Sequence, residues 1–299
     1  MTYFFHLLII ANVYVMLAVS LNIVAGYGGY LSLSHATFFA FGGYAYALAT
    51  LGLGCGFLPS LLVAIMVGVL ASFPLSLLSW RFRGDVFVMV SLAFQAVAFG
   101  LLYNWNTPGV PPVTLRNLTN GPFGLSGIPR PAFGGIVFDT VGSVCALSLA
   151  LTVAVICICW ILVRSPWGRL MKSIRDDELA VKGLGKPVNL VKVQGFAFSC
   201  AIASVSGALY CGYIGYIDPS SASLDQSILL LSMVVVGGLG NLRGPILGAL
   251  ILVLLPELLR SLSLSETALA DVRIMVYGLL LVAMMHFRPQ GIAGVYRLD

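Results

Sequence analysis

Long runs of the chain carry no charged side chain. Residues 3–25 and 140–163 contain no Asp, Glu, Lys or Arg. A helix rises about 1.5 Å per residue, so each run can cross a hydrocarbon core of roughly 30 Å. Only 9% of all residues are charged and the mean hydropathy is +1.00, whereas a water-facing surface needs far more charge. The sequence therefore predicts a polytopic membrane protein.

The apolar runs predict an all-α bundle that forms one transmembrane domain over residues 1–299. The start of the chain lacks the basic region of a cleavable signal peptide, and its charge-free run is too long for one, so we expect it to be the first span. About nine spans are expected in total. They are residues 3–25, 36–52, 58–80, 86–104, 140–163, 195–216, 226–240, 245–260 and 272–287.

Two glycine-rich stretches interrupt these spans. The first break, residues 26–35, reads GYGGYLSLSH, and the second break, residues 237–244, reads GGLGNLRG. Irregular backbone occurs at membrane depth only where protein or water covers it, and paired discontinuities are typical of an inverted repeat with its pathway at the interface. We therefore expect a gate at the inner end of a pathway, made by Gly28, Gly29, Ser32, Ser34, His35, Gly237, Gly238 and Asn241.

Two alternatives to a gate stay open for the first break. It could be a glycine-rich turn between two closely packed helices. His35 could equally be a helix-start residue at the interface, bonded to backbone groups. A dinucleotide fingerprint is disfavoured, because Leu31 stands where the third glycine belongs.

Two polar segments are expected outside the membrane. Residues 105–139 are rich in proline and glycine and should form an external loop that caps the bundle. Residues 164–194 should form a cytoplasmic loop, because the stretch from Arg164 to Lys192 holds 7 of the 16 Lys and Arg residues. With strict alternation of spans, Arg81, Arg83, Arg243, Arg288 and Arg297 are also inside, whereas Arg116, Arg130, Arg260 and Arg273 are outside.

The cytoplasmic loop is expected to contain a docking helix over residues 174–184. Ser173 is placed to cap it, the acidic residues Asp176, Asp177 and Glu178 are in its first turn, and Gly185 ends it. Pro187 then suits the first position of a second short helix. The first helix should present a face of small and apolar residues to a partner, made by Leu179, Ala180, Gly183 and Leu184. An ordinary solvated loop that only sets topology is the alternative.

Three segments resemble the permeases of ATP-binding-cassette (ABC) importers of the branched-chain amino acid type. They are GYGGYLSLSHATFFAFGGY, DELAVKGLGKPVNLVKVQGFAFS and VVVGGLGNLRGPILGA, and the likeness extends over nearly the whole chain from Leu21 to Ile292. The resemblance implies a type II importer fold with a coupling helix that fits a groove on a cytoplasmic ATPase. The coupling residues that it implies are Asp177, Glu178, Leu179, Ala180, Gly183, Leu184 and Gly185.

The same resemblance implies the partners and the location. These are two ATPase subunits, a paralogous permease subunit in a heterodimer, a periplasmic substrate-binding protein and the lipid of a bacterial inner membrane. No nucleic acid partner is expected, because the basic residues are scattered over short loops. No cofactor is expected either. Residues 44–49 depart from the expected pattern, since they offer no obvious polar group to hold a substrate.

The source of energy can be argued from the residues. The cores of the expected spans contain no Asp, Glu, Lys or Arg, which disfavours an ion-coupled carrier. GLGKP at residues 183–187 imitates a phosphate loop, but Ala180 and Pro187 replace the required Gly and Ser or Thr, so ATP must bind to another subunit. Three scattered histidines disfavour an intramembrane enzyme. Amino acids, urea or short amides are all possible substrates, and a stand-alone solute channel is the remaining alternative.

Overall fold

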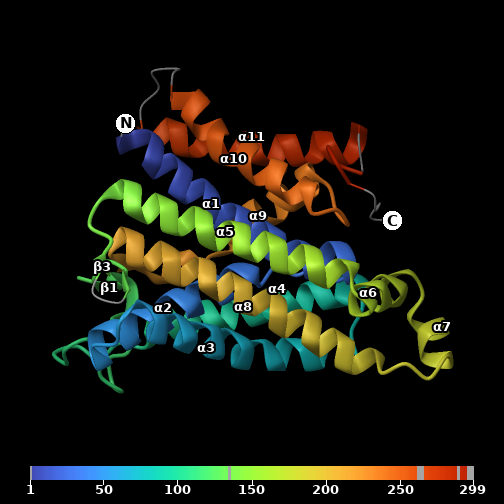
Figure 1. Cartoon of the computed structure of the whole chain (residues 1–299), viewed down its shortest axis with the longest axis horizontal. Coiled ribbons are helices and arrows are strands. Elements are labelled where there is room, and N and C mark those ends of the chain that lie inside the picture. Colours follow the sequence, from blue (N-terminus) through green and yellow to red (C-terminus); the bar gives the residue numbers. More distant parts are fainter. Residues whose placement is uncertain (1, 134–135, 261–265, 288–289, 295–299) are drawn as a thin grey trace.

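The computed structural model describes residues 2–133, 136–260, 266–287 and 290–294, which form a bundle of roughly parallel and antiparallel helices (Figure 1). The α-helices are α1 (Thr2–Asn22), α2 (His35–Leu53), α3 (Phe57–Leu78), α4 (Gly84–Asn104), α5 (Val141–Arg164), α6 (Pro166–Asp176), α7 (Glu178–Gly183), α8 (Val188–Ile214), α9 (Leu224–Gly237), α10 (Arg243–Arg260) and α11 (Glu266–Phe287). A π-helical turn, η1 (Ile23–Tyr27), extends α1, and two 3-10 turns are η2 (Gly121–Phe123) and η3 (Pro219–Ala222).

The long helices correspond to the expected spans. Six of the described helices are long and apolar enough to cross a membrane: α1 with η1, α2, α3, α4, α5 and α8. Helix α9 is shorter, with 14 residues, while α10 and α11 lie where the last two spans are expected. The all-α, multi-pass architecture is therefore confirmed, whereas the count of nine spans stays a prediction.

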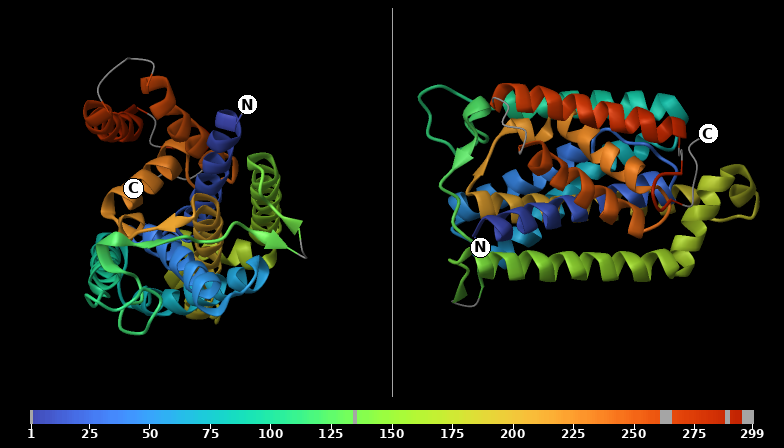
Figure 2. Two further views of the ribbon diagram at one scale, coloured as in Figure 1. Left: turned by 90° about the vertical axis from the view of Figure 1, so that its left-hand side faces the viewer. Right: turned by 90° about the horizontal axis from the view of Figure 1, so that it is seen from above.

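Helix α8 packs closely against α2 and α3 through small residues. A Cβ added to Gly42 of α2 or to Gly68 of α3 would collide with Ser204 of α8. A Cβ on Gly207 would in turn collide with the backbone of Phe39. Small residues at such crossings let helix backbones approach, which is how membrane helices gain packing energy without a hydrophobic drive between them. Helix α5 is instead at the edge of the bundle (Figure 2).

The expected external loop forms a cap at one end of the bundle. Within it, β1 (Leu125–Ser126) pairs with β4 (Tyr216–Ile217), which follows α8, and β2 (Ala132–Phe133) pairs with β3 (Ile136–Val137). Helices α6 and α7 lie at the opposite end (Figure 1). The two polar segments therefore occupy opposite ends of the molecule.

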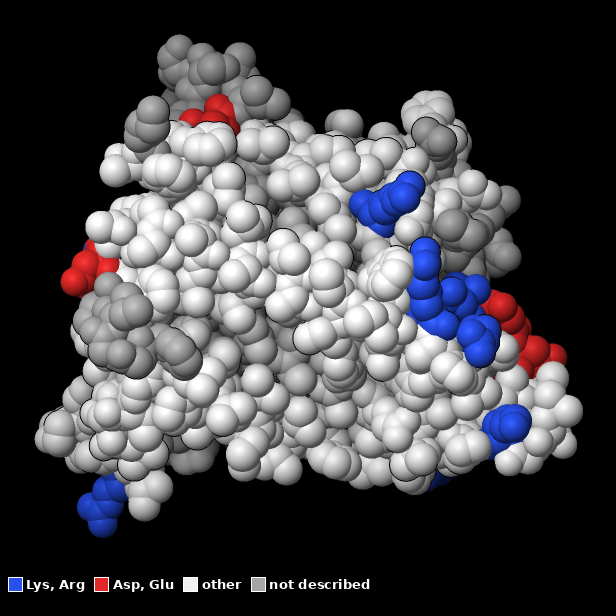
Figure 3. Space-filling model, in the orientation of Figure 1, with Lys and Arg blue, Asp and Glu red and all other residues white. Residues whose placement is uncertain are grey.

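Basic side chains gather at the end that carries α6 and α7 (Figure 3). This agrees with the predicted bias of Lys and Arg toward one side of the membrane. Of the residues assigned to the inner side, Arg288 and Arg297 lie outside the described residues.

The helix boundaries between residues 164 and 194 differ from the prediction. Ser173 does not cap a helix: it lies inside α6, where its hydroxyl donates to the carbonyl of Arg169 at 3.1 Å, as serines in helix interiors often do. Helix α6 begins earlier because Ser165 accepts a hydrogen bond from the backbone of Gly168 and Pro166 occupies its first position. Asp177 then ends α6 and caps α7, so the helix that was expected over residues 174–184 begins at Glu178.

The second short helix expected after Pro187 is not separate. Pro187 precedes α8, which continues without interruption for 27 residues. No glycine or proline stands between Val188 and Gln194, so nothing in the sequence ends the helix before the expected span begins. The described coupling region is therefore α6 and α7, followed directly by α8.

Candidate coupling and gate site

Helix α7 presents an apolar docking face, defined here as Leu179, Ala180, Gly183 and Leu184. Leu179 is 72% exposed and Leu184 is 76% exposed. Ala180 and Gly183 are exposed too, and no atom lies within 4 Å of a Cβ built on Gly183. Large exposed leucines on a six-residue helix at the polar end of the molecule are typical of a surface that a partner covers. The face is open in the described chain.

The ends of α7 are fixed by the residues that the sequence pointed to. The carboxylate of Asp177 accepts hydrogen bonds at 3.0 Å from the backbone N–H groups of Leu179 and Ala180. Gly185 has a φ of +69°, the left-handed conformation that ends helices and that glycine adopts without strain. These two residues define the length of α7.

Glu178 lies on the opposite side of α7 from the docking face and is only 7% exposed. Its carboxylate lies 2.6 Å from Arg83, 2.9 Å from Lys182 and 2.8 Å from Lys192. It also accepts a hydrogen bond of 3.2 Å from the hydroxyl of Tyr30. We call these five residues the Glu178 cluster. They come from α7, α8, the residue before α4 and the segment after η1.

The cluster keeps Glu178 ionised. Burial of the carboxylate would raise its pKa, but the hydrogen bonds that it accepts from Lys192 and Lys182, with the charge of Arg83, outweigh burial and hold the pKa below its ordinary value. The side chain of Lys192 is itself 1% exposed, and its ammonium group donates to the carbonyl of Ser79 at 3.2 Å. Removing one partner of such a buried ion pair is energetically costly, because the other charge would remain buried alone.

The first break begins with the π-helical turn η1. The N–H of Gly28 donates to the carbonyl of Ile23 at 3.0 Å, one residue further than in an α-helix. Gly29 follows with a φ of +76°, so the chain leaves the helix there. The expected break therefore starts at Gly28, and Gly26 is still helical.

The polar residues at the end of the first break are all buried. Ser32 and Ser34 share a hydrogen bond of 2.9 Å between their hydroxyls. His35 is the first residue of α2, is 2% exposed, and its Nε2 lies 2.7 Å from the hydroxyl of Ser20. The hydroxyl of Ser20 also lies within hydrogen-bond distance, 2.8 Å, of the carbonyl oxygen of Leu17. His35 is thus a buried side chain bonded to another side chain, unlike the interfacial, backbone-bonded alternative.

Helix α6 packs directly on the first break. The guanidinium of Arg175 donates to the carbonyl of Gly26 at 2.8 Å. A Cβ on Gly29 would lie 2.6 Å from Cγ of Arg175, and a Cβ on Gly28 would lie 2.8 Å from Cε of Met171. A side chain at either glycine would force Met171 or Arg175 to shift, so the two glycines favour the close approach of α6.

The second break turns sharply between α9 and α10. Gly238 has a φ of +107° and Gly240 a φ of +77°. Gly237 packs against the backbone of Gly244, and Gly238 packs against the backbone of Gly294. Asn241 donates from its side chain to the carbonyl of Ala293 at 3.1 Å.

The two breaks, more than 200 residues apart in the sequence, are in direct contact. The side chain of Asn22 accepts a hydrogen bond from the N–H of Gly240 at 3.1 Å and donates to the carbonyl of Asn241 at 3.1 Å. A Cβ on Gly26 would lie 2.6 Å from the nitrogen of Gly240. The structure thus joins the coupling region, the first break and the second break in one continuous set of contacts. Ser32, Ser34 and His35 lie further along the first break, on its α2 side.

Several residues of this site were not predicted from the sequence. Arg83, Lys192 and Arg175 were counted as loop charges, and Tyr30 was not singled out. One signal was available: Ser165 followed by Pro166 marks a helix start and would have placed α6. Nothing in the spacing of Glu178 and Lys192 indicates that the two would pair below the docking face.

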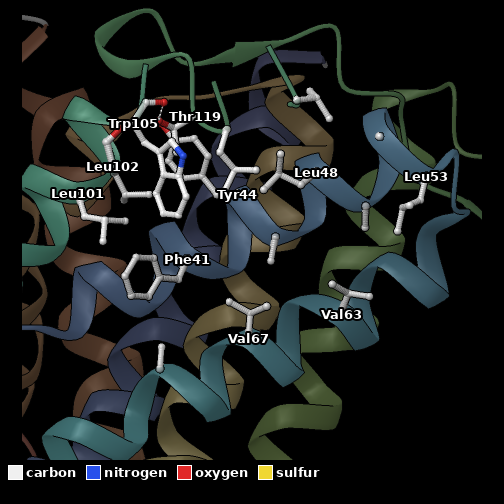
Figure 4. A pocket seen from close by; sticks show the side chains of 16 residues that line it. Phe41, Tyr44, Leu48, Leu53, Val63, Val67, Leu101, Leu102, Trp105 and Thr119 are labelled. Atoms are coloured by element: carbon white, nitrogen blue, oxygen red, sulfur yellow. Dashed lines mark hydrogen bonds between the residues drawn. The ribbon is translucent and has the colours of Figure 1, made fainter. Parts of the chain in front are cut away.

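A separate cavity of about 560 Å³ lies at the other end of the bundle, between α2, α3, α4 and the external loop (Figure 4). Tyr44 and Leu48, from the segment that departs from the expected pattern, form part of its wall. The hydroxyl of Thr119 donates to the carbonyl of Leu102 at 2.6 Å, and the indole of Trp105 donates to the carbonyl of Leu115 at 3.0 Å. The Thr119 hydroxyl and the Trp105 indole are therefore bonded within the chain, whereas the Tyr44 hydroxyl is buried without a hydrogen-bond partner among the described residues.

Comparisons with known proteins agree with this architecture. The sequence profile of the family described as "Branched-chain amino acid transport system / permease component" matches residues 3–285. The chain is 31% identical over 308 aligned residues to the high-affinity branched-chain amino acid transport system permease protein LivM of Escherichia coli K12, covering 95% of this chain and 68% of that protein. The corresponding LivM of Salmonella typhimurium LT2 is 32% identical over the same shares.

A more distant relative is the fructose import permease protein FrcC of Rhizobium meliloti, which is 29% identical over 126 residues, 40% of this chain and 35% of that protein. No solved structure matches the chain significantly. The profile covers all but the ends of the chain, and the similarity to the LivM proteins extends over almost its whole length. The chain belongs to the family of branched-chain amino acid transport system permeases.

Proposed function

We propose that the chain is the permease subunit of an ABC importer that moves branched-chain amino acids across the inner membrane. Separate ATPase subunits supply the energy, a paralogous permease forms the other half of the membrane channel, and a binding protein delivers substrate on the outer side. The observation that carries this proposal is the exposed docking face of α7, directly joined to a helix break inside the bundle. A transport subunit driven from outside needs both features.

The docking face fits an ATPase groove. Its two leucines project from a short helix that is capped at both ends, so the helix is preorganised before a partner binds. Gly183 leaves room for a close approach of another surface. Asp177 and Gly185 hold the helix ends, while Glu178 acts from beneath the face.

The two glycine breaks form the inner gate in this proposal. Gly28, Gly29, Gly237 and Gly238 bring backbones together where side chains would keep them apart, and Asn241 lies where the breaks meet. Hinges and gates are commonly built from a few residues that absorb large changes of φ and ψ. Ser32, Ser34 and His35 supply the polar side chains of the same region.

The substrate assignment follows the LivM relatives, whose names state branched-chain amino acid transport. The six described spans carry charged side chains only near their ends, at Asp85, Arg164 and Lys192, and Lys192 is neutralised by Glu178. A zwitterion with an apolar side chain suits such a path. Urea or a short amide is the second candidate, favoured by the same lack of charge, and a fructose permease among the partial relatives shows that related chains carry other neutral solutes.

The substitution Gly183→Trp tests the proposal. No atom lies within 4 Å of the position, so the variant should fold and insert, while the indole blocks the docking face. In proteoliposomes with the cognate ATPase subunits and binding protein, we expect uptake of radiolabelled leucine to fall by about tenfold or more. Gly142→Trp, at an equally open position at the start of α5, is the matched control. Unchanged uptake and ATP hydrolysis in Gly183→Trp would contradict the proposal.

A further inference from the structure

We infer that Glu178 is a positioning residue that transmits the movement of the docking helix to the gate. The inference rests on the proposed function, because it assumes that a partner moves α7. In this inference, the buried carboxylate on the side of α7 opposite the docking face makes α7, the start of α8 and the first break move together.

The geometry carries this assignment. Glu178 belongs to α7, yet its carboxylate contacts Lys192 of α8 at 2.8 Å and Arg83 before α4 at 2.6 Å. Its contact with Tyr30, at 3.2 Å, reaches the first break just after Gly29. Apart from this carboxylate, α7 enters the bundle through the buried side chain of Val181. A six-residue helix with so little buried surface would otherwise be free to move without the bundle.

The charge of Glu178 makes the contact resistant to separation. Lys192 is almost fully buried, so moving α7 away would leave an ammonium group without a counter-charge in a poorly hydrated place. The half-exposed Arg83 and Lys182 can be hydrated instead, and therefore follow the carboxylate at little cost. A displacement of α7 thus favours movement of Lys192 and α8 over rupture of the pair.

A second contact joins the coupling region to the segment around the first break. Arg175 of α6 donates to the carbonyl of Gly26, which belongs to the η1 turn a few residues before Tyr30. Asn22, one turn before Gly26, contacts the second break. The Glu178 cluster therefore acts on the same short segment that touches both breaks. Among the residues that the structure describes, Glu178 is the acidic side chain that contacts the first break.

The double variant Glu178→Leu/Lys192→Met tests the inference, because it removes both buried charges together and leaves the docking face intact. In the full complex with the cognate ATPase and binding protein, we expect co-purification of the ATPase and ATP hydrolysis without substrate to stay within about twofold of wild type. Leucine uptake per ATP hydrolysed should fall by about tenfold. Asp85→Asn is the matched control, since Asp85 is an exposed carboxylate at the same end of the molecule and should leave uptake unchanged.

A milder variant keeps the test decisive if the double variant folds poorly. Tyr30→Phe removes only the hydroxyl that bonds to Glu178 and keeps the ring packed against Phe87 and Phe196. We expect a smaller loss of uptake per ATP, about threefold. A merely structural role would lower protein yield and leave uptake per ATP the same in the protein that folds.

Three outcomes would overturn the inference. They are wild-type uptake per ATP in the double variant, wild-type uptake per ATP in Tyr30→Phe, and loss of ATPase co-purification in the double variant, which would make Glu178 part of the docking surface itself. Two other results would contradict the proposed function instead. One is a wild-type complex that does not couple ATP hydrolysis to leucine uptake, and the other is unchanged uptake and ATP hydrolysis in Gly183→Trp.

Discussion

The side-chain amide of Asn22 donates a hydrogen bond of 3.1 Å to the backbone carbonyl of Asn241, 219 residues further along the chain. Together with the bond from Gly240 to the same side chain, it ties the end of the first helix to the turn between α9 and α10. We predict that Asn22→Ala leaves both backbone groups unpaired and costs about 1–3 kcal/mol of stability. Thermal unfolding in detergent measures this loss.

Asn104→Ala is the control for Asn22→Ala. Asn104 is exposed and bonds to the carbonyl of Gly100 within its own helix. Its removal should cost well under about 1 kcal/mol, as for most surface substitutions. An equal loss of stability in both variants would mean that the Asn22 contact does not hold the breaks together.

Alanine at the two glycine breaks should be harmful for reasons of geometry. Gly238 has a φ of +107° and lies against the backbone of Gly294, so Gly238→Ala meets both strain and collision. Gly29→Ala meets strain and the flexible side chain of Arg175, which can shift, so its effect should be smaller. Leucine uptake in proteoliposomes should be abolished in Gly238→Ala and reduced in Gly29→Ala.

Gly54→Ala separates strain from close approach. Gly54 ends α2 with a φ of +62°, but no atom lies within 4 Å of a Cβ built on it. The substitution should cost only the strain of a left-handed residue, about 1–2 kcal/mol. Wild-type uptake in Gly238→Ala, or a loss in Gly54→Ala as large as in Gly238→Ala, would refute the role given to the breaks.

Cysteine labelling should place the two polar ends on opposite sides of the membrane. In a cysteine-free background, Arg81→Cys and Arg116→Cys are suitable because both positions are exposed, whereas Asn117 in the same loop is buried. A membrane-impermeant maleimide should label Arg116→Cys from outside and Arg81→Cys only after permeabilisation. Labelling of both from one side would disprove the predicted topology.

State-dependent labelling tests the gate itself. Ser32 is 2% exposed, and Asn241 is partly buried. Ser32→Cys and Asn241→Cys should therefore react slowly in the nucleotide-free complex and faster in the ATP-trapped complex, if water enters between the breaks. Equal rates in both states would exclude these residues from the gate.

Acid should weaken the Glu178 cluster. The pKa of Glu178 is lowered in the folded chain, so its stabilising contribution is complete above the unfolded-state pKa of about 4.3 and is lost as the pH falls through the lower folded value. Arg83, Lys182 and Lys192 then lose the carboxylate that they share as a partner. The melting temperature of the wild type should fall below about pH 4.3, more steeply than that of Glu178→Leu/Lys192→Met. Parallel pH profiles would show that the cluster does not contribute.

The sequence predicted the elements that depend on local pattern. The apolar runs predicted the long helices, and glycine at positions 29, 185 and 238 marked places where φ is positive. Boundaries inside the coupling region were wrong because two caps competed: Ser173 and Asp177 are both good capping residues, and only packing of α6 on the first break decides between them.

Contacts between distant segments could not be predicted in the same way. Lys192 has the sequence features of a loop cation, and its burial depends on a carboxylate that another helix brings to it. The pairing of Asn22 with Gly240 likewise depends on how the halves of the chain pack, for which a single sequence has no periodic signal. The site was therefore predicted as separate pieces, and the structure joins them.

The Glu178 cluster also has a consequence for synthesis of the chain. Tyr30 and Arg83 leave the ribosome long before Glu178, and the separation between Tyr30 and Glu178 is 148 residues. The turn after α1 therefore cannot reach its final contacts until the chain has grown past α7, and the bond from Asn22 must wait for Gly240. An insertion intermediate that stops before residue 178 should hold its first two helices in the membrane with this turn still hydrated. The turn therefore reaches its final structure late in biogenesis.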